Sequence, residues 1–186
     1  MTPQPLLVRF LASDHGRWSI VSSQPVVGQR LPPAAALTVF EGRAAVEPAP
    51  GGVWSLSGVV SNERYVNRAE RMTLDARQQP LGRPDATAAA LIPIRKSARW
   101  WQLTQDERRD IFEERSHHIR IGTGALPAVA RRLLHSRDLG EPFDFLTWFE
   151  FAPSQVGEFD EVLAGLRASQ EWTYVEREVE IRLTRL

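Results

Sequence analysis

The chain has 186 residues, which fits one compact domain or two small subdomains that share a core. Its 23 basic and 23 acidic residues cancel, so it lacks the positive charge that nucleic-acid binding requires. It contains no cysteine, which excludes a disulfide framework, a thiolate nucleophile, a cysteine-ligated zinc and an iron–sulfur cluster. Histidine and carboxylate side chains are therefore the candidate metal ligands.

Neither a signal peptide nor a membrane span is predicted. The N-terminal apolar run is short and is interrupted by Arg9. No stretch approaches the roughly 20 apolar residues that cross a bilayer. We therefore expect a soluble cytoplasmic protein with neither nucleic acid nor a membrane as partner.

The first half of the chain predicts a sheet with little helix. Apolar runs bounded by proline, glycine and Ser-Asp turns predict four strands, at residues 6–12, 18–27, 37–46 and 53–60. A polar segment at residues 67–79 can hold a short helix until Pro80 breaks it. We expect two halves, residues 1–85 and 86–186.

The second half predicts a mixed order of strands and helices. A buried strand at residues 87–101 precedes Thr104 and Glu107, which form a capping box for a helix that runs to about residue 116. The next helix is expected from Thr123, with Arg131 and Arg132 on the two flanks of its apolar face.

The remaining elements are a strand at residues 143–151, a helix opened by Pro153 and a final strand at residues 171–186. Alternation predicts two apolar faces, one made of Phe143, Phe145, Thr147, Phe149 and Phe151 and the other of Val175, Val179, Ile181 and Leu183. The order of these elements predicts an α+β fold with helices on one side of the sheet.

The residues between Ser116 and Phe151 combine adjacent histidines, His117 and His118, with two arginines and an aromatic strand. An imidazole, a guanidinium and an apolar aromatic wall together indicate a haem pocket. Histidine at a helix end is more often a cap or a surface residue, and an aromatic row is more often core. Composition does not choose between the two histidines as a ligand.

Three segments, WWQLTQDERRDIFEERS, ARRLLHSRDLGEPFDFLTWFEF and EWTYVEREVEIRLTR, resemble the chlorite dismutase family, in particular its short branch. The resemblance covers residues 96–185. It implies a ferredoxin-like dimeric α/β barrel with two ferredoxin-like halves per subunit, of which the first is abbreviated and the second binds haem b. It further implies a homodimer and an enzyme that decomposes chlorite to chloride and dioxygen.

The resemblance also implies roles for individual residues. The spacing to Arg131 matches the family pattern for His118 as the iron ligand, with Arg131 as the catalytic cation that retains the hypochlorite intermediate and Glu171 as the acid that orients the histidine. The other matches are Thr147 and Phe149 in the pocket, Asn62, Tyr65, Lys96 and Trp100 at the haem propionates, and Gln78 beside the arginine.

The sequence also leaves other functions open. A coproheme decarboxylase would use a tyrosine and lack the arginine, whereas this chain has Arg131 and only two tyrosines, Tyr65 and Tyr174. A peroxidase-like haem enzyme, a haem-binding or sensing protein, and a cofactor-free dimeric α+β barrel are the further alternatives. His15 and His135 are interpreted as ordinary polar residues.

Overall fold

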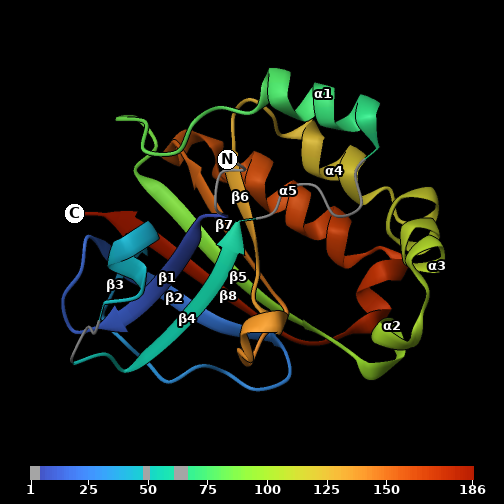
Figure 1. Ribbon diagram of the computed structural model, residues 1–186. Helices are drawn as coiled ribbons and strands as arrows, with labels where there is room; N and C mark the ends of the chain where they lie inside the picture. The colour runs from blue at the N-terminus through green and yellow to red at the C-terminus, as the bar shows by residue number, and fades with distance from the viewer. Residues whose placement is uncertain (1–4, 48–50, 61–66) are drawn as a thin grey trace.

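A closed barrel of antiparallel strands forms the centre of the computed structural model, which describes residues 5–47, 51–60 and 67–186 (Figure 1). Around the barrel the strands follow the order β1-β3-β2-β8-β5-β7-β6-β4. Their bounds are Leu7–Ser13 (β1), Trp18–Val27 (β2), Ala36–Glu41 (β3), Trp54–Val60 (β4), Ala88–Lys96 (β5), Ala130–His135 (β6), Phe145–Phe151 (β7) and Val175–Arg185 (β8). Closure leaves no free sheet edge among these strands.

The two halves of the chain contribute four consecutive strands each, and both halves have the same strand order. In each half the fourth strand pairs with the first, the first with the third and the third with the second. The halves join where β2 pairs with β8 and where β4 pairs with β6. The barrel is thus one structure built from both halves.

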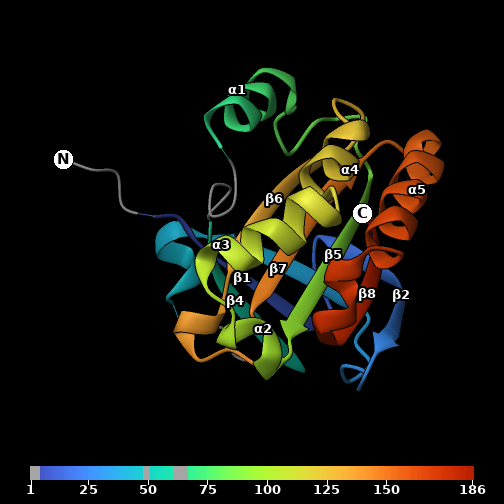
Figure 2. The same cartoon turned by 90° about the vertical axis from the view of Figure 1, so that its right-hand side faces the viewer.

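The helices lie outside the barrel, and those of the second half cover the outer face of β5 to β8 (Figure 2). Their bounds are Arg68–Arg77 (α1), Ala98–Gln102 (α2), Gln105–Arg109 (α3), His118–Gly124 (α4) and Val156–Arg167 (α5). The prediction of a mixed fold with helices on one side is confirmed for this half. None of the helices in the described ranges is long and apolar enough to cross a membrane.

Two apolar clusters occupy opposite faces of the same strands. Inside the barrel, Phe10, Leu134, Trp148 and Ile181 are buried together. Outside it, the residues that pack between the strands and α5 include Ile92, Phe149, Phe151, Phe159 and Leu163. The rings of Phe151 and Phe159 stack with their centroids 4.7 Å apart. Alternate residues of a strand therefore serve two cores.

The predicted helix from Thr123 is wrong. The helix begins earlier, at His118, and ends at Gly124, and the segment that carries the arginines is β6, which pairs with β7 along its length. Apolar residues three and four positions apart in a short run are compatible with a helix. The same run is also compatible with a strand that is buried on both faces. Pairing decided the outcome here, because β6 fills the position between β4 and β7.

Three strands end or begin at other residues than predicted. After Glu41 the chain turns into a 3-10 helix at Gly42–Ala45, so the third strand is shorter. The strand β5 ends at Lys96 because α2, which holds both Trp100 and Trp101, begins at Ala98, with Ser97 at the N-cap position. The last strand begins at Val175, after a 3-10 turn at Gln170–Tyr174 that contains Glu171.

The predicted apolar faces also need two corrections. Phe143 precedes β7 and packs in the cluster inside the barrel, whereas Phe149 and Phe151 pack in the outer one. A register shift between β5 and β8 at Arg95 and Lys96 breaks the alternation of β8. As a result Val175 joins the outer cluster, while Val179, Ile181 and Leu183 point into the barrel.

The capping box at the start of α3 is confirmed. The backbone N–H of Thr104 donates to Glu107 Oε2 at 2.7 Å, and the Thr104 side chain completes the reciprocal cap. After Arg109 the helix continues as a π-helical turn at Asp110–Arg115. This helix therefore reaches the histidine pair, as predicted, and fixes where α4 begins.

Candidate active site

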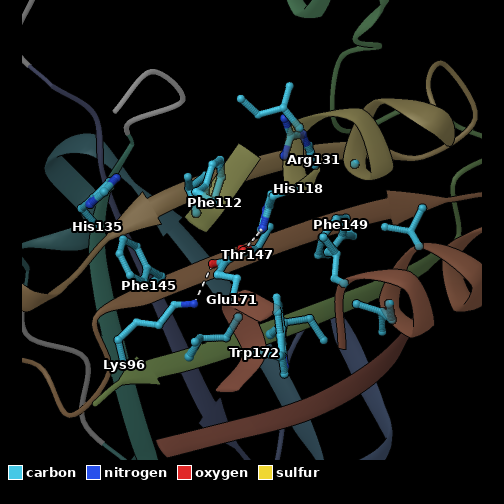
Figure 3. Close-up of a pocket in the computed structure, with 18 of the residues that line it drawn as sticks. Lys96, Phe112, His118, Arg131, His135, Phe145, Thr147, Phe149, Glu171 and Trp172 are labelled. Atoms are coloured by element: carbon cyan, nitrogen blue, oxygen red, sulfur yellow. Dashed lines mark hydrogen bonds and ion pairs between the residues drawn. The ribbon is translucent and has the colours of Figure 1, made fainter. Parts of the chain in front are cut away.

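A cavity lies between the outer face of β5, β6 and β7 and the helical segments that cover it (Figure 3). It encloses about 1040 Å³ of empty space, its open mouth included. Most of its lining is apolar, and the polar side chains in it are Lys96, His118, Arg131, His135, Thr147 and Glu171. A few converging polar groups in a mostly apolar cavity are typical of a ligand site.

The two adjacent histidines point in different directions. His117 has a left-handed backbone, with φ 53° and ψ 36°, and it separates the π-helical turn from α4. Such a φ is uncommon for a residue other than glycine. His117 is exposed, whereas His118, the first residue of α4, lines the cavity. The change of backbone direction at His117 therefore turns one imidazole outward and the other inward.

His118 is oriented by a buried carboxylate. Its Nδ1 lies 2.6 Å from Glu171 Oε2, and Glu171 Oε1 accepts a 2.6 Å hydrogen bond from Lys96 Nζ (Figure 3). Glu171 and Lys96 are both buried. Within the described part of the chain, Nε2 of His118 has no hydrogen-bonding partner, so it is the ring nitrogen available to a ligand.

The charge of Glu171 is set by its two partners. Burial alone would raise its pKa, but the positive charges and hydrogen bonds of His118 and Lys96 outweigh burial and lower the pKa to about 2. The carboxylate is therefore ionised at neutral pH. Its backbone N–H donates to Ser116 Oγ at 2.9 Å, which ties the Glu171 turn to the segment before His118.

Aromatic rings flank the imidazole. The Phe112 ring is nearly parallel to that of His118, with centroids 4.1 Å apart, and the Trp172 ring is also nearly parallel at 6.3 Å. Lys96 Nζ lies 4.7 Å from the Trp100 ring centroid and 5.3 Å from that of Trp172. The ammonium thus lies near two indole rings as well as its carboxylate partner.

Arg131 enters the cavity from β6. The outward-facing residues of this strand are Arg131, Leu133 and His135, and across the ladder Arg131 lies opposite Phe149 of β7. In the described ranges the guanidinium has no hydrogen-bond or ion-pair partner, and burial lowers its pKa. A cation without a counter-charge in an apolar wall favours binding of an anion.

Gly122 lies next to this guanidinium. A Cβ added to Gly122 would lie 3.5 Å from Arg131 Nη1 and 4.0 Å from its Cζ. Gly122 belongs to α4, which also carries His118. The same short helix therefore presents the imidazole and borders the arginine.

Seven of the predicted site residues line this one cavity: Lys96, Trp100, His118, Arg131, Thr147, Phe149 and Glu171. Gln78 follows the end of α1 and is half-buried, and it does not belong to the lining. Asn62 and Tyr65 lie outside the described residues. The Lys96 ammonium, expected at a propionate, is hydrogen-bonded to Glu171.

Sequence reasoning missed several lining residues, among them Phe112, Leu133, His135 and Trp172. Reading residues 130–135 as a strand would have placed Leu133 and His135 on the face of Arg131. Instead, His135 was interpreted as an ordinary polar residue, yet it is buried with its ring edge against Phe145, at a centroid distance of 5.0 Å.

Comparison with known families adds independent information. The sequence profile described as "Chlorite dismutase" matches residues 37–186, which is most of the chain. The chain belongs to the chlorite dismutase family.

Individual members of the chlorite dismutase family agree with this assignment. The crystal structure of a dimeric chlorite dismutase from Nitrobacter winogradskyi is 54% identical, with a TM-score of 0.88 over 96% of this chain and 99% of that one. A chlorite dismutase of Ideonella dechloratans is 34% identical over 86 residues, which span 46% of this chain and 28% of that relative.

The fold extends to more distant chlorite dismutases. The structure of the enzyme from Candidatus Nitrospira defluvii in complex with imidazole has a TM-score of 0.66, over 98% of this chain and 92% of that one, at 19% identity. At this identity the similarity concerns the fold alone. The antiparallel barrel is therefore shared within the family even where the sequences have diverged.

Proposed function

We propose that this protein is a haem b enzyme that decomposes chlorite to chloride and dioxygen. The observation that carries the proposal is one apolar cavity that holds both an imidazole backed by a buried carboxylate and a guanidinium that has no counter-charge among the described residues. When bound, haem supplies the redox chemistry that breaks the Cl–O bonds and forms the O–O bond. Family membership supports the same activity.

The donor set fits haem iron. His118 would hold the iron through Nε2, because Nδ1 is occupied by Glu171. No group of three or more histidine, aspartate or glutamate side chains that could hold a metal ion occurs in the described residues. With His118 as its one protein ligand, the iron would remain able to bind a substrate, as an enzyme that acts on a small anion requires.

Glu171 and Lys96 would keep His118 in one orientation. The ionised carboxylate accepts the Nδ1–H, which fixes the tautomer and makes the imidazole a stronger donor to the metal. The Lys96 ammonium holds the other carboxylate oxygen. Because both side chains are buried, water competes little for either hydrogen bond.

Arg131 would bind chlorite and retain the hypochlorite intermediate. A unit anion 4 Å from the guanidinium gains about 4 kcal/mol at an effective dielectric constant of about 20, and desolvation reduces this figure. Phe149 lies opposite Arg131 on β7 and Thr147 lies opposite Leu133; both line the cavity and would restrict water. We assign Asn62, Tyr65 and Trp100 to the haem propionates and Gln78 to Arg131 as further proposals, whereas Lys96 is assigned to Glu171.

We also propose a homodimer whose subunits each contain two ferredoxin-like halves, residues 1–85 and 86–186. The strand order supports the assignment of two ferredoxin-like halves, because both halves have the strand order of a ferredoxin-like sheet. The dimeric state of the Nitrobacter winogradskyi relative supports the dimer. Light scattering on purified protein should give twice the mass of the chain, and a pentamer or a monomer would contradict this. A cytoplasmic location also remains a prediction.

Oxygen evolution tests the activity. Protein reconstituted with haem b should release dioxygen and chloride in equal amounts on addition of chlorite, measured with an oxygen electrode and by ion chromatography. A Soret band without oxygen release would indicate a haem-binding or sensing protein. No Soret band would indicate a cavity for another ligand. A coproheme decarboxylase is disfavoured because Arg131 lines the cavity and Tyr174 does not.

A matched pair of variants tests whether Arg131 retains hypochlorite. Arg131→Ala should bind haem but release hypochlorite, which a chlorination reporter traps, and should lose turnover by about tenfold because the redox chemistry belongs to the cofactor. The expected sites of oxidative damage are the two tryptophans that line the cavity, Trp100 and Trp172. Arg132→Ala is the control, since Arg132 pairs with Glu41 and points away from the cavity. Leakage from Arg132→Ala alone would contradict the assignment.

A further inference from the structure

Trp172 forms part of the cavity wall beside His118, and its indole N–H is hydrogen-bonded to a residue that does not line the cavity. The ring lies nearly parallel to the imidazole and faces the Lys96 ammonium. Its Nε1 donates a 2.7 Å hydrogen bond to Glu178 Oε2. Glu178 lies on β8, at the outer face of the barrel, and is completely buried. The acceptor therefore sits outside the cavity and fixes a ring that lines it.

Glu178 also belongs to a chain of charged side chains on β8 and α5. Its Oε1 accepts two hydrogen bonds from Arg167, at 3.0 Å from Nε and 2.6 Å from Nη2. Arg167 pairs in addition with Glu180 at 2.7 Å. Glu180 bonds Arg182, and Arg182 reaches Asp160. The chain thus links the Trp172 indole to the surface of α5.

Glu178 is not needed to neutralise Arg167. The network contains two arginines and three carboxylates, so Glu180 and Asp160 already balance the positive charges. Burying a further carboxylate is costly, and an apolar residue in its place is often neutral or stabilising. A residue that breaks this rule calls for a compensating role. Glu178 differs from Glu180 in the described structure because it accepts a hydrogen bond from the Trp172 indole N–H.

We propose that Glu178 is a positioning residue that fixes the Trp172 ring as a wall of the cavity beside His118. Indole is a donor only, so a carboxylate oxygen at this point defines one rotamer of the ring. The ring in turn limits the space beside the imidazole and the Lys96 ammonium. The proposal rests on the proposed function in one respect only, that haem is the group expected to contact the Trp172 ring.

Indole resonances of the 15N-labelled protein without haem test the positioning directly. The chain has 6 tryptophans, and Trp172→Phe identifies the signal of Trp172. Glu178→Leu should shift this signal and speed its hydrogen exchange by about tenfold, the factor that corresponds to about 1.4 kcal/mol for a charged hydrogen bond. Glu178→Gln keeps an acceptor and should restore most of the protection.

Glu180→Gln is the matched control. It removes a carboxylate from the same network and the same strand, but Glu180 makes no contact with Trp172 in the described structure, so the indole signal should stay in place. If Glu178→Leu does not fold, Glu178→Gln still decides, since it should shift the Trp172 signal more than Glu180→Gln does. Equal shifts from the two glutamine variants would overturn the proposal.

Haem titration gives a second readout. Glu178→Leu should weaken haem binding by about tenfold in the parent. In the Trp172→Phe background it should cause no further loss, because the two residues act through one contact. Equal losses in both backgrounds would mean that Glu178 acts only through its ion pair between β8 and α5, and this would overturn the proposal. If the parent binds no haem, the proposed function fails, while the indole signals still decide the role of Glu178.

Discussion

Replacing Arg131 by methionine should make the protein more stable and its anion binding weaker. The guanidinium lies in an apolar wall, its pKa is lowered by burial, and it has no ion-pair partner in the described ranges. Replacing buried charges by apolar side chains of similar volume often stabilises a protein by about 1–4 kcal/mol. The lower end applies here because the side chain faces an open cavity, so we expect a gain of about 1 kcal/mol in urea unfolding of the haem-free protein.

The cost should appear in the affinity for anions. A charge-assisted hydrogen bond contributes about 1.5–3 kcal/mol, so nitrite should bind Arg131→Met about 10- to 100-fold more weakly than the parent. The assay is a spectroscopic titration of haem-loaded protein. Imidazole, which is neutral, is the control ligand, and its affinity should not fall. A loss of affinity for nitrite but not for imidazole would therefore be due to the charge of Arg131.

Two results would refute this reasoning. A loss of stability in Arg131→Met would mean that the guanidinium is paired in the native protein. Equal losses of nitrite and imidazole affinity would mean that Arg131 shapes the pocket rather than supplying charge. Arg132→Met is the matched control, because Arg132 pairs with Glu41 on the other face of β6. It should leave nitrite affinity unchanged and cost up to about 1 kcal/mol of stability.

Three further predictions concern His118, Lys96 and Asp144. His118→Ala should abolish the Soret band, whereas His117→Ala should keep it; the reverse would assign the ligand to His117. Lys96→Met should lower urea stability by about 3 kcal/mol, because it leaves the buried Glu171 with one partner; an unchanged midpoint would argue against this ion pair. Burial raises the pKa of Asp144, so its carboxyl destabilises the fold increasingly as pH rises from the pKa of the unfolded chain toward the raised value. The stability of Asp144→Asn relative to the parent should therefore increase from about pH 4 upward, and a flat difference would contradict the shift.

The sequence predicted the site better than the elements that carry it. His118, Arg131 and Glu171 were found from their spacing in a family pattern, and all three line one cavity. Their secondary structures were partly wrong, since Arg131 lies on a strand and Glu171 in a 3-10 turn. A spacing pattern records which residues meet in space, and it is independent of how a local run of apolar residues is interpreted.

The closure of the barrel could not be predicted from local patterns. The existence of four strands in the first half followed from apolar runs and the turn residues that bound them. Closure depends on pairing across the halves, such as Trp18 with Arg185 and Val60 with Leu134. These residues are far apart in the sequence, and nothing in either segment specifies its partner. Periodicity reports which face of a strand is buried, but pairing determines what covers it.

Arg131 and Arg132 illustrate how much depends on strand register. They are identical neighbours, and on the predicted helix both would have flanked one apolar face. On β6 successive side chains point to opposite faces, so Arg131 enters the cavity and Arg132 meets Glu41 at the end of the barrel. A shift of β6 by one residue against β7 would exchange them, placing the other guanidinium beside Phe149 and turning Leu133 away from the cavity. The pairing of β6 with β7, rather than the identity of the residue alone, therefore decides which arginine can bind an anion and which one stabilises the fold.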